Sequence, residues 1–591
     1  MNSLALLFEV FPFFALLIFI VLSFAAIIGW GVAFRHALGL PVVRPGCIGD
    51  FWLGYLFALI MVEFFNLWLP IDWWISGFYF AIGLILFIKY QTPYRRDLLT
   101  AFRRPSIYSI SELLLFIISL TLVLFACSWA MVTPINEDSW SYHFQSIRWM
   151  NEYPIVPGLG NLHGRLAFNQ SHFGFLALLN FFPYWNKGYA AGGLLLLLAT
   201  AFTAISVIFR AISLKRTLLV LLLLVIEPMA RYSASPSPDF AVSLLQIVAV
   251  IYFVYLLYSS PIDAKQRDSD FLAVTCVCAA LCTVKLSGLV FAAAVLGAAC
   301  WSGRGLLFLG NRKIFFRLFL VLVFFALTHL ARGVITSGVP LYPITLGSSW
   351  HHDWSVPLDR IRNEAGWIYS CARTRSPCVN PDLLAQDWSW VDFWWNNRIP
   401  TNAKVLCFIS VIAFTVASWV QRSGSGLERS VPKNAWLLMF PFLSALIFWF
   451  FSAPDVRFLG RLIELMFAAS VWSVMCSLGS RGVAGPHTGS WRFLAFPILH
   501  RPLIFSALLS LILLIFCFRL LPTSGFRWAA LPEPAVSLVT SAYGVPVHIP
   551  LDGSCWFQKL PCTPSVDPQL EYRDPANLDP LANGFRIHGI P

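Results

Sequence analysis

The feature that most constrains this chain is a long succession of apolar stretches, most of them near the length of a membrane-crossing helix. A bilayer core of about 30 Å is crossed by roughly 20 apolar helical residues. Of the 591 residues, 58% are hydrophobic and only 12% are charged. We therefore expect an all-α fold, a polytopic transmembrane helical bundle of about 13–14 spans. The fourteen candidate spans lie near 5–34, 51–69, 72–90, 110–132, 188–209, 216–230, 240–259, 271–285, 287–302, 314–336, 403–421, 436–453, 459–478 and 502–521.

Lysine and arginine predict the orientation of these spans, because cytoplasmic loops are enriched in both. Every second predicted loop is basic, beginning with Arg95, Arg96, Arg103 and Arg104 after the third span. The N-terminus and three longer segments then lie on the outer side of the membrane. These segments are the loops 133–187 and 337–402 and the tail 522–591. The net charge of +12 resides mainly in the short basic loops, so we expect no nucleic-acid partner.

The span pattern predicts three parts. Residues 1–109 form three N-terminal transmembrane helices, 110–521 form a membrane core that carries both outer loops, and 522–591 form an outer C-terminal tail. The two apolar stretches on either side of Lys285 can be two helices or one broken helix.

Four of the 13 cysteines form two similar pairs in predicted outer segments. Cys371 and Cys378 are the first and last residues of CARTRSPC, and Cys555 and Cys562 are the first and last residues of CWFQKLPC. Disulfides belong to oxidising compartments, so two disulfides on the outer side agree with the orientation from charge. The alternative is that these are four unrelated thiols.

The stretch NEDSWSYHF, 136–144, presents a dense polar group just after an apolar run. It contains Glu137, Asp138, Tyr142 and His143, and helical spacing places Asp138 and Tyr142 on one face. The following residues, through Met150, predict an interfacial helix that lies on the membrane.

Further polar groups lie near span ends on the same predicted side, where they can surround one cavity. Each also has a structural alternative. Asp239 can be a helix N-cap, Lys285 can reach the lipid headgroups, Arg457 can be an interfacial anchor, and the histidines can be ordinary loop residues. The residues are His163, Arg165, Asn169, His172, Asp239, Lys285, Asp455 and Arg457.

This set of side chains suits transfer of a sugar from a polyprenyl phosphate. The anionic phosphate leaving group needs cations placed in advance, a role for Lys285 and Arg457. The acceptor hydroxyl needs a proton acceptor, for which Asp138 is the first candidate and Glu137 the second. Asp239 can orient the acceptor or, with Asp138, hold a divalent cation, the one cofactor that this chemistry suggests.

The pattern Asp138, Tyr142 and His143 resembles the acidic motif in the first outer loop of GT-C class glycosyltransferases, and the Asp239 loop is similar to their second acidic loop. The motifs NEYPIVPGLGNLHGRLAFN, SPSPDF, GVPLYPI and PDVRF together resemble a largely uncharacterised family of bacterial multi-pass membrane proteins. These resemblances imply a GT-C-like core with horizontal helices on its outer face. They also imply a bacterial inner-membrane location, a periplasmic active site, a polyprenyl-phosphate-linked donor and a glycan or lipid-linked acceptor.

Three other readings stay open. A transporter or flippase of lipid-linked saccharides would place charges in mid-membrane on broken helices. A polymerase or ligase of the O-antigen type would depend on arginines in the large outer loop, where Arg360, Arg362, Arg373 and Arg375 stand. A structural subunit of an envelope complex would use the outer loops as a docking surface.

Overall fold

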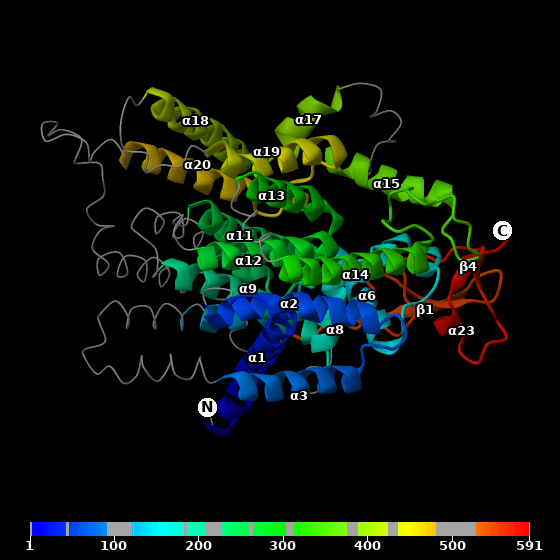
Figure 1. Cartoon of the computed structure of the whole chain (residues 1–591). Coiled ribbons are helices and arrows are strands. Elements are labelled where there is room, and N and C mark those ends of the chain that lie inside the picture. Colours follow the sequence, from blue (N-terminus) through cyan, green and yellow to red (C-terminus); the bar gives the residue numbers. More distant parts are fainter. Residues whose placement is uncertain are drawn as a thin grey trace, which may run out of the picture.

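The computed structural model is a helical bundle with a small domain of short strands at one end (Figure 1). Seven helices in the described part are long and apolar enough to cross a membrane. They are α1 Ser3–Leu38, α2 Gly46–Phe65, α3 Trp73–Tyr90, α9 Gly188–Ile208, α11 Pro238–Tyr258, α14 Arg312–Ser337 and α18 Thr401–Ser423. The structure describes residues 3–42, 46–91, 121, 123–181, 186–208, 227–258, 264–302, 312–374, 388–423, 435–479 and 528–589.

Four further helices complete the described bundle and agree with predicted spans. They are α12 Ala264–Val284, α13 Leu289–Trp301, α19 Ala435–Ser452 and α20 Leu462–Gly479. The chain is extended at Lys285, with φ −160°, and α13 then packs against α12. The two stretches around Lys285 are therefore two helices. The predicted span near 502–521 lies outside the described residues, as do most of the span near 216–230 and about half of the span near 110–132, whose residues 123–130 are helical.

The helices differ in how much of their apolar surface the protein itself covers. Of the apolar stretch of α11, 94% is buried within the protein, whereas only 17% of the apolar stretch of α18 is buried. Large apolar side chains such as Phe408 and Trp419 on α18 and Leu327 on α14 face outward. Soluble proteins rarely expose apolar patches of this extent. The exposed apolar surface of these helices therefore suits a lipid environment.

Glycines let the first three helices approach closely. A Cβ on Gly54 of α2 would lie 1.9 Å from the Ile27 carbonyl oxygen, and one on Gly29 would lie 2.0 Å from that of Gly83 on α3. Small residues at helix contacts are typical of membrane helix packing, because they allow backbones to touch.

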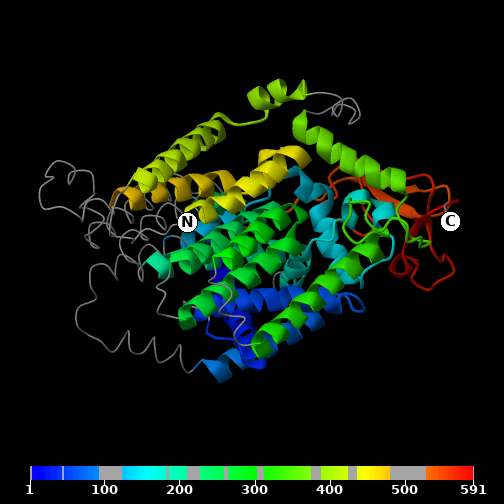
Figure 2. The same cartoon turned by 45° about the horizontal axis from the view of Figure 1, so that its top comes forward.

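Among the described residues, most of the short helices and all of the strands gather at one end of the bundle, which we call the loop end (Figures 1 and 2). It holds a π-helix, η1 Ser139–His143, and the short helices α6 Phe144–Glu152, α7 Leu159–Leu162, η2 Gly164–Ala167 and α8 Ser171–Leu179. The longer α15 Leu358–Arg373 contacts η2 and α17 Trp390–Asn397, and the 3-10 helix η6 Val456–Leu459 contacts α11 and α19.

Helix α6 corrects one expectation. It is amphipathic as predicted, but its apolar residues Phe144, Ile147 and Trp149 are at most 2% exposed and pack inside the protein. Phe144 packs against Trp556 and Phe557 near the C-terminus, and Trp149 packs against Phe585. The apolar face of α6 is therefore covered by protein and not by membrane.

The C-terminal domain, residues 528–589, corrects the all-α expectation. It contains two antiparallel two-stranded sheets, β1 Val536–Thr540 with β2 Pro546–Pro550 and β3 Leu570–Tyr572 with β4 Phe585–Ile587, besides α23 Pro580–Asn583. Gly544, with φ +87°, lies in the turn between β1 and β2. Strands this short carry little periodic signal, so the apolar spans dominated the sequence-based prediction.

The C-terminal domain is anchored to the loop end by backbone hydrogen bonds. The Trp556 N–H donates to the Trp140 carbonyl oxygen at 2.8 Å, and the Phe585 N–H donates to that of Pro157 at 3.0 Å. The predicted Cys555–Cys562 disulfide is present. Cys371 is also disulfide-bonded, and Cys378 lies outside the described residues.

Candidate functional site

A cavity of about 460 Å³ opens at the loop end and draws its walls from η1, η2, η4 Leu286–Gly288, α14, α15, α19 and η6. Its lining combines charged or hydroxylated side chains with apolar ones. The charged or hydroxylated residues include Asp138, Tyr142, Arg165, Lys285, Glu364 and Arg457. The apolar residues include Leu341, Ile344, Ile368, Phe448 and Leu462.

Asp138 forms ion pairs with two of the cationic side chains that line the cavity. Its backbone N–H donates to Asn136 Oδ1 at 3.0 Å, a local turn that sets the start of η1. Its two carboxylate oxygens accept from different arginines, Oδ1 from Arg165 Nη1 at 2.6 Å and Oδ2 from Arg457 Nη1 at 3.0 Å. The structure thus joins residues that are 27 and 319 positions apart in the sequence.

Asp455 orients Arg457. Its Oδ1 caps the 3-10 helix η6 by accepting from the Arg457 N–H at 3.0 Å. Its Oδ2 accepts from Arg398 Nη2 at 2.6 Å and lies 3.8 Å from Arg457 Nε. Asp455 therefore positions Arg457, while Arg457 itself reaches the cavity.

Lys285 forms an ion pair with Asp239, which lies in the first turn of α11. The Lys285 Nζ also lies 4.6 Å from the centre of the Phe458 ring, and the Arg457 guanidinium lies 4.8 Å from the same ring. Each of these contacts is favourable, since the face of an aromatic ring carries negative potential. Asp239 is absent from the cavity wall and supports it through Lys285.

Glu364 on α15 is a cavity residue that the sequence interpretation missed. Its Oε1 lies 3.7 Å from Arg165 Nε, so Arg165 stands between two carboxylates, those of Asp138 and Glu364. The neighbouring sequence, LDRIRNEAG, has the charge pattern of a solvated helix face, which hid Glu364.

The two carboxylates differ in proton affinity. Burial raises the pKa of Asp138, but the charges of Arg457 and Arg165 outweigh it, and the net pKa is lowered. Burial raises the pKa of Glu364, which Arg165 offsets only in part and the charge of Asp138 reinforces. One cavity thus holds a strongly ionised acid and a more basic one.

Other predicted residues fall into two groups. Tyr142 and Asn169 line the cavity, and the Arg165 guanidinium lies 5.6 Å from the centre of the Tyr142 ring. His143, His163, His172 and Glu137 do not line it: Glu137 is exposed, and the histidines are buried or half-buried. Burial lowers the pKa of His143 to about 3 and, together with Arg165, that of His163 to about 4. A direct role for these four residues in the cavity therefore has no geometric support.

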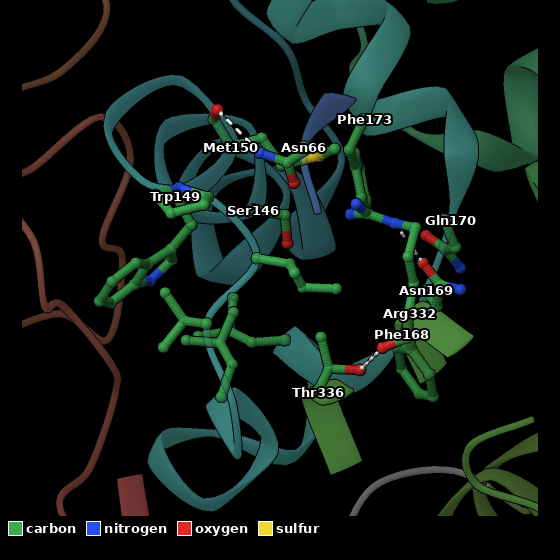
Figure 3. A pocket seen from close by; sticks show the side chains of 15 residues that line it. Asn66, Ser146, Trp149, Met150, Phe168, Asn169, Gln170, Phe173, Arg332 and Thr336 are labelled. Atoms are coloured by element: carbon green, nitrogen blue, oxygen red, sulfur yellow. Dashed lines mark hydrogen bonds between the residues drawn. The ribbon is translucent and has the colours of Figure 1, made fainter. Parts of the chain in front are cut away.

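A second charged cluster, which the sequence interpretation also missed, joins α2 to α14. Glu63 is fully buried, and its Oε1 lies 2.8 Å from His329 Nδ1. Arg332 donates to the Glu63 carbonyl oxygen at 3.2 Å and to Asn169 Oδ1 at 3.3 Å. Figure 3 shows Arg332 and Asn169 beside a smaller cavity of about 50 Å³. The signal for this cluster was a lone acid inside an apolar run, FALIMVEFFNLW.

The predicted divalent-cation site finds little support in the described residues. No group of three or more His, Cys, Asp or Glu side chains gathers among them. Asp138 and Asp239, the two suggested ligands, are each paired with cationic side chains. Their oxygens therefore meet nitrogen donors in this arrangement.

The fold and the cavity define a class: a helical protein with several membrane-length helices and a cavity lined by both charged and apolar side chains. Residues 13–463 match the model of DUF8201, described as a domain of unknown function. The match covers more than half of the chain, which therefore belongs to this family. The C-terminal domain lies beyond the matched residues. Comparisons with curated proteins and with solved structures gave no match.

Proposed function

We propose that the protein is a membrane glycosyltransferase of the bacterial inner membrane. It would move a sugar from a polyprenyl-phosphate-linked donor to a glycan or lipid-linked acceptor in a cavity that faces the periplasm. The observation that supports this most is the mixed lining of the cavity, which combines the cations Arg165, Lys285 and Arg457 with many apolar side chains. A lipid phosphate carries the same two chemical characters.

The cations are placed to receive a phosphate. The side chains of Arg165 and Arg457 are 42% and 50% exposed, whereas that of Asp138, between them, is 15% exposed. An incoming phosphate therefore meets the guanidinium groups before it meets the carboxylate. Arginine binds phosphate oxygens in bidentate fashion, and cations fixed in advance stabilise the charge that develops on a leaving phosphate.

The apolar side chains that line the cavity suit the prenyl chain of the donor and the membrane around it. Ile368 of α15 and Phe448 of α19 face the cavity together with Leu462 of α20. Burial of apolar surface stabilises by roughly 25 cal/mol per Å², so several isoprene units supply a few kcal/mol of affinity.

Asp138 has a different part in this proposal from the general base that its sequence position suggests. Both of its oxygens are occupied by arginine, and its lowered pKa makes it a weak proton acceptor. We assign Asp138 the role of holding the two guanidinium groups at the spacing that a phosphate needs.

A polymerase or ligase that works through arginines of the large outer loop fits less well. Arg360 pairs with Asp567 at 2.5 Å, and Arg373 is buried, donating to carbonyl oxygens at the end of α19. Arg362 is exposed on α15, and Arg375 lies outside the described residues. None of the three described arginines lines the cavity.

A carrier of lipid-linked saccharides is the second candidate function. Glu63, His329 and Arg332 lie within helices of membrane-crossing length, where ionisable groups often mark substrate pathways. A carrier would move the lipid-linked sugar between vesicle leaflets without forming a glycosidic bond.

The test is transfer by the purified full-length protein in lipid nanodiscs, incubated with a panel of polyprenyl-phosphate sugars and envelope glycan acceptors. We expect one donor to be consumed and Arg457→Ala to slow its transfer at least about 100-fold. Arg461→Ala is the matched control, because Arg461 lies outside the cavity and pairs with Glu464 at 2.7 Å. Absence of transfer by the unaltered protein, or full transfer by Arg457→Ala, would overturn the proposal.

A further inference from the structure

The cavity provides a proton acceptor that needs no rearrangement of the arginines around Asp138. We propose that Glu364 is the catalytic base, which takes the proton of the acceptor hydroxyl. This inference rests on the proposed function and deepens it by assigning a role to a residue of α15.

The first argument is the availability of lone pairs. Within the described part of the chain, the Glu364 carboxylate forms an ion pair with Arg165, in which Glu364 Oε1 lies 3.7 Å from Arg165 Nε. That distance is too long for a hydrogen bond. Asp138, in contrast, accepts hydrogen bonds at 2.6 and 3.0 Å on its two oxygens. The Glu364 side chain is 20% exposed and lines the cavity, so its oxygens are open to a hydroxyl group.

The second argument is the way the chain holds Glu364 in place. At the C-terminal end of α15, Arg373 donates to the carbonyl oxygens of Phe451 and Ser452, at 3.0 and 3.1 Å. Nearer its start, α15 buries Ile361. A base on a helix that is fixed at both ends keeps its position, and general base catalysis requires such a fixed position.

The third argument is the space around the carboxylate. A Cβ on Gly164 would lie 2.9 Å from the Tyr342 hydroxyl oxygen and 3.3 Å from Glu364 Oε2, so only glycine leaves both groups undisturbed. The charged and titratable groups that face Glu364 are Arg165 of η2, Asp138 of η1 and Tyr342. Burial, reinforced by the charge of Asp138, keeps the pKa of Glu364 above its ordinary value, although Arg165 lowers it.

The reaction balances without a further reactant. The acceptor oxygen forms a bond to the anomeric carbon while its proton passes to the Glu364 carboxylate. The bond between the anomeric carbon and the phosphate oxygen breaks, and its electron pair leaves with the polyprenyl phosphate, which Arg165, Arg457 and Lys285 hold. A single displacement of this kind inverts the anomeric centre. Two carboxylates whose surroundings separate their pKa values are a frequent sign of divided roles.

The experiment compares Glu364→Gln, Glu364→Ala and the control Asp359→Asn, which removes an exposed carboxylate from the same helix. The assay is sugar transfer in nanodiscs, with the donor KM and the pH–rate profile measured for each variant. We expect Glu364→Gln to lower kcat by about 10²–10⁴-fold, with the donor KM within about twofold. The acidic limb of the profile should disappear in this variant. Sodium formate should restore part of the kcat of Glu364→Ala, because a small carboxylate can occupy the vacated space.

Three outcomes overturn the assignment. The first is a kcat of Glu364→Gln within tenfold of the unaltered protein. The second is an unchanged acidic limb. The third is a fall in kcat with a raised donor KM that formate does not reverse, which indicates a structural role. Absence of transfer by the unaltered protein overturns the proposed function itself, and this assignment with it. Thermal unfolding of each variant separates misfolding from loss of catalysis, and Glu364→Asp, which keeps a carboxylate, should retain more transfer than Glu364→Gln.

Discussion

Two charged clusters border the same cavity and are built in opposite ways. The cluster around Asp138 is assembled from η1, η2, α15 and η6, four segments far apart in the sequence, and its arginines are about half exposed. The cluster around Glu63 is assembled mainly from α2 and α14, and Glu63 has no exposed surface. His329 lines the cavity from the second cluster, so the two clusters meet there.

The difference in exposure separates two uses of charge. Half-exposed arginines can exchange a carboxylate for a ligand, because water stabilises them during the exchange. A sealed carboxylate cannot, because an unpaired ion in a low-dielectric interior costs several kcal/mol. We therefore expect substitutions in the Asp138 cluster to reduce transfer, and substitutions in the Glu63 cluster to reduce stability.

The largest expected effect on stability is that of Glu63→Ala. Removal of this carboxylate leaves the buried Arg332 without the negative charge that Glu63 supplies, at a cost of about 3–5 kcal/mol in the free energy of unfolding. The measurement is denaturant or thermal unfolding in detergent micelles. Glu137→Ala, at an exposed acid, is the control and should change stability by less than about 0.5 kcal/mol. Equal free energies of unfolding for the two variants would show that the buried cluster around Glu63 stabilises the protein no more than an exposed acid does.

Asp138→Asn should have the opposite profile. The amide can accept a hydrogen bond from only one of the two arginines, and the mutual repulsion of the arginines then displaces the groups that we propose to bind phosphate. We expect transfer to fall about 10²–10³-fold, while the free energy of unfolding changes by less than about 2 kcal/mol. The neighbouring Glu137→Gln should keep full transfer. A variant that transfers normally would remove Asp138 from the proposed site, and one that fails to fold would remove the contrast with Glu63.

The sequence predicted the first cluster far better than the second. Asp138, Arg165, Lys285 and Arg457 stand at span ends, where polar residues are conspicuous against apolar runs. The arrangement in which one carboxylate bridges two arginines, and the role that follows from it, needed three-dimensional contacts. Glu364 was hidden in an amphipathic helix with several other charges, and no spacing rule distinguishes a cavity-facing glutamate from a solvated one.

The span pattern also predicted most of the described helices, because apolar length is a strong signal. It did not predict the β-strands of the C-terminal domain. Val536–Thr540 and Pro546–Pro550 are five residues each, and their pairing depends on the turn at Gly544 that brings the two strands together. It also did not predict the destination of the apolar face of α6, since periodicity shows that a face is apolar and not what covers it.

The pH dependence of stability sharpens the comparison at an intermediate scale. His143 directly precedes α6, close in sequence to Asp138, yet it is sealed like Glu63, and burial lowers its pKa to about 3. The unfolded chain binds a proton at this histidine below about pH 6.5, whereas the folded protein does not until about pH 3. Stability should therefore fall as the pH is lowered through this window, by at most about 1.4 kcal/mol per pH unit for one proton.

His143→Asn tests this directly. The variant has no imidazole to protonate, so its unfolding free energy should depend less steeply on pH between about 4 and 6 than that of the unaltered protein. His588→Asn is the matched control, because His588 is exposed on the C-terminal domain and pairs with Glu571 at 3.0 Å. Identical slopes for the unaltered protein and His143→Asn would contradict the burial of a neutral histidine beside the cavity.

The smallest expected effect is at an ion pair that belongs to neither cluster. Arg573 of the C-terminal domain binds Asp353 at 2.7 and 3.1 Å, and the Asp353 side chain is 43% exposed. Exposed pairs contribute about 0.2–1 kcal/mol, because water screens them and the side chains lose entropy. Asp353→Asn should therefore change neither transfer nor unfolding by more than this amount. Arg573→Ala should cost more, since it also removes the contact of the guanidinium with the Trp354 ring, 4.6 Å from its centre. Proteolytic release of the C-terminal domain measures both variants. If Asp353→Asn released the domain as readily as Arg573→Ala, charge and not ring stacking would hold the domain in place, and partial exposure would no longer separate weak pairs from strong ones in this protein.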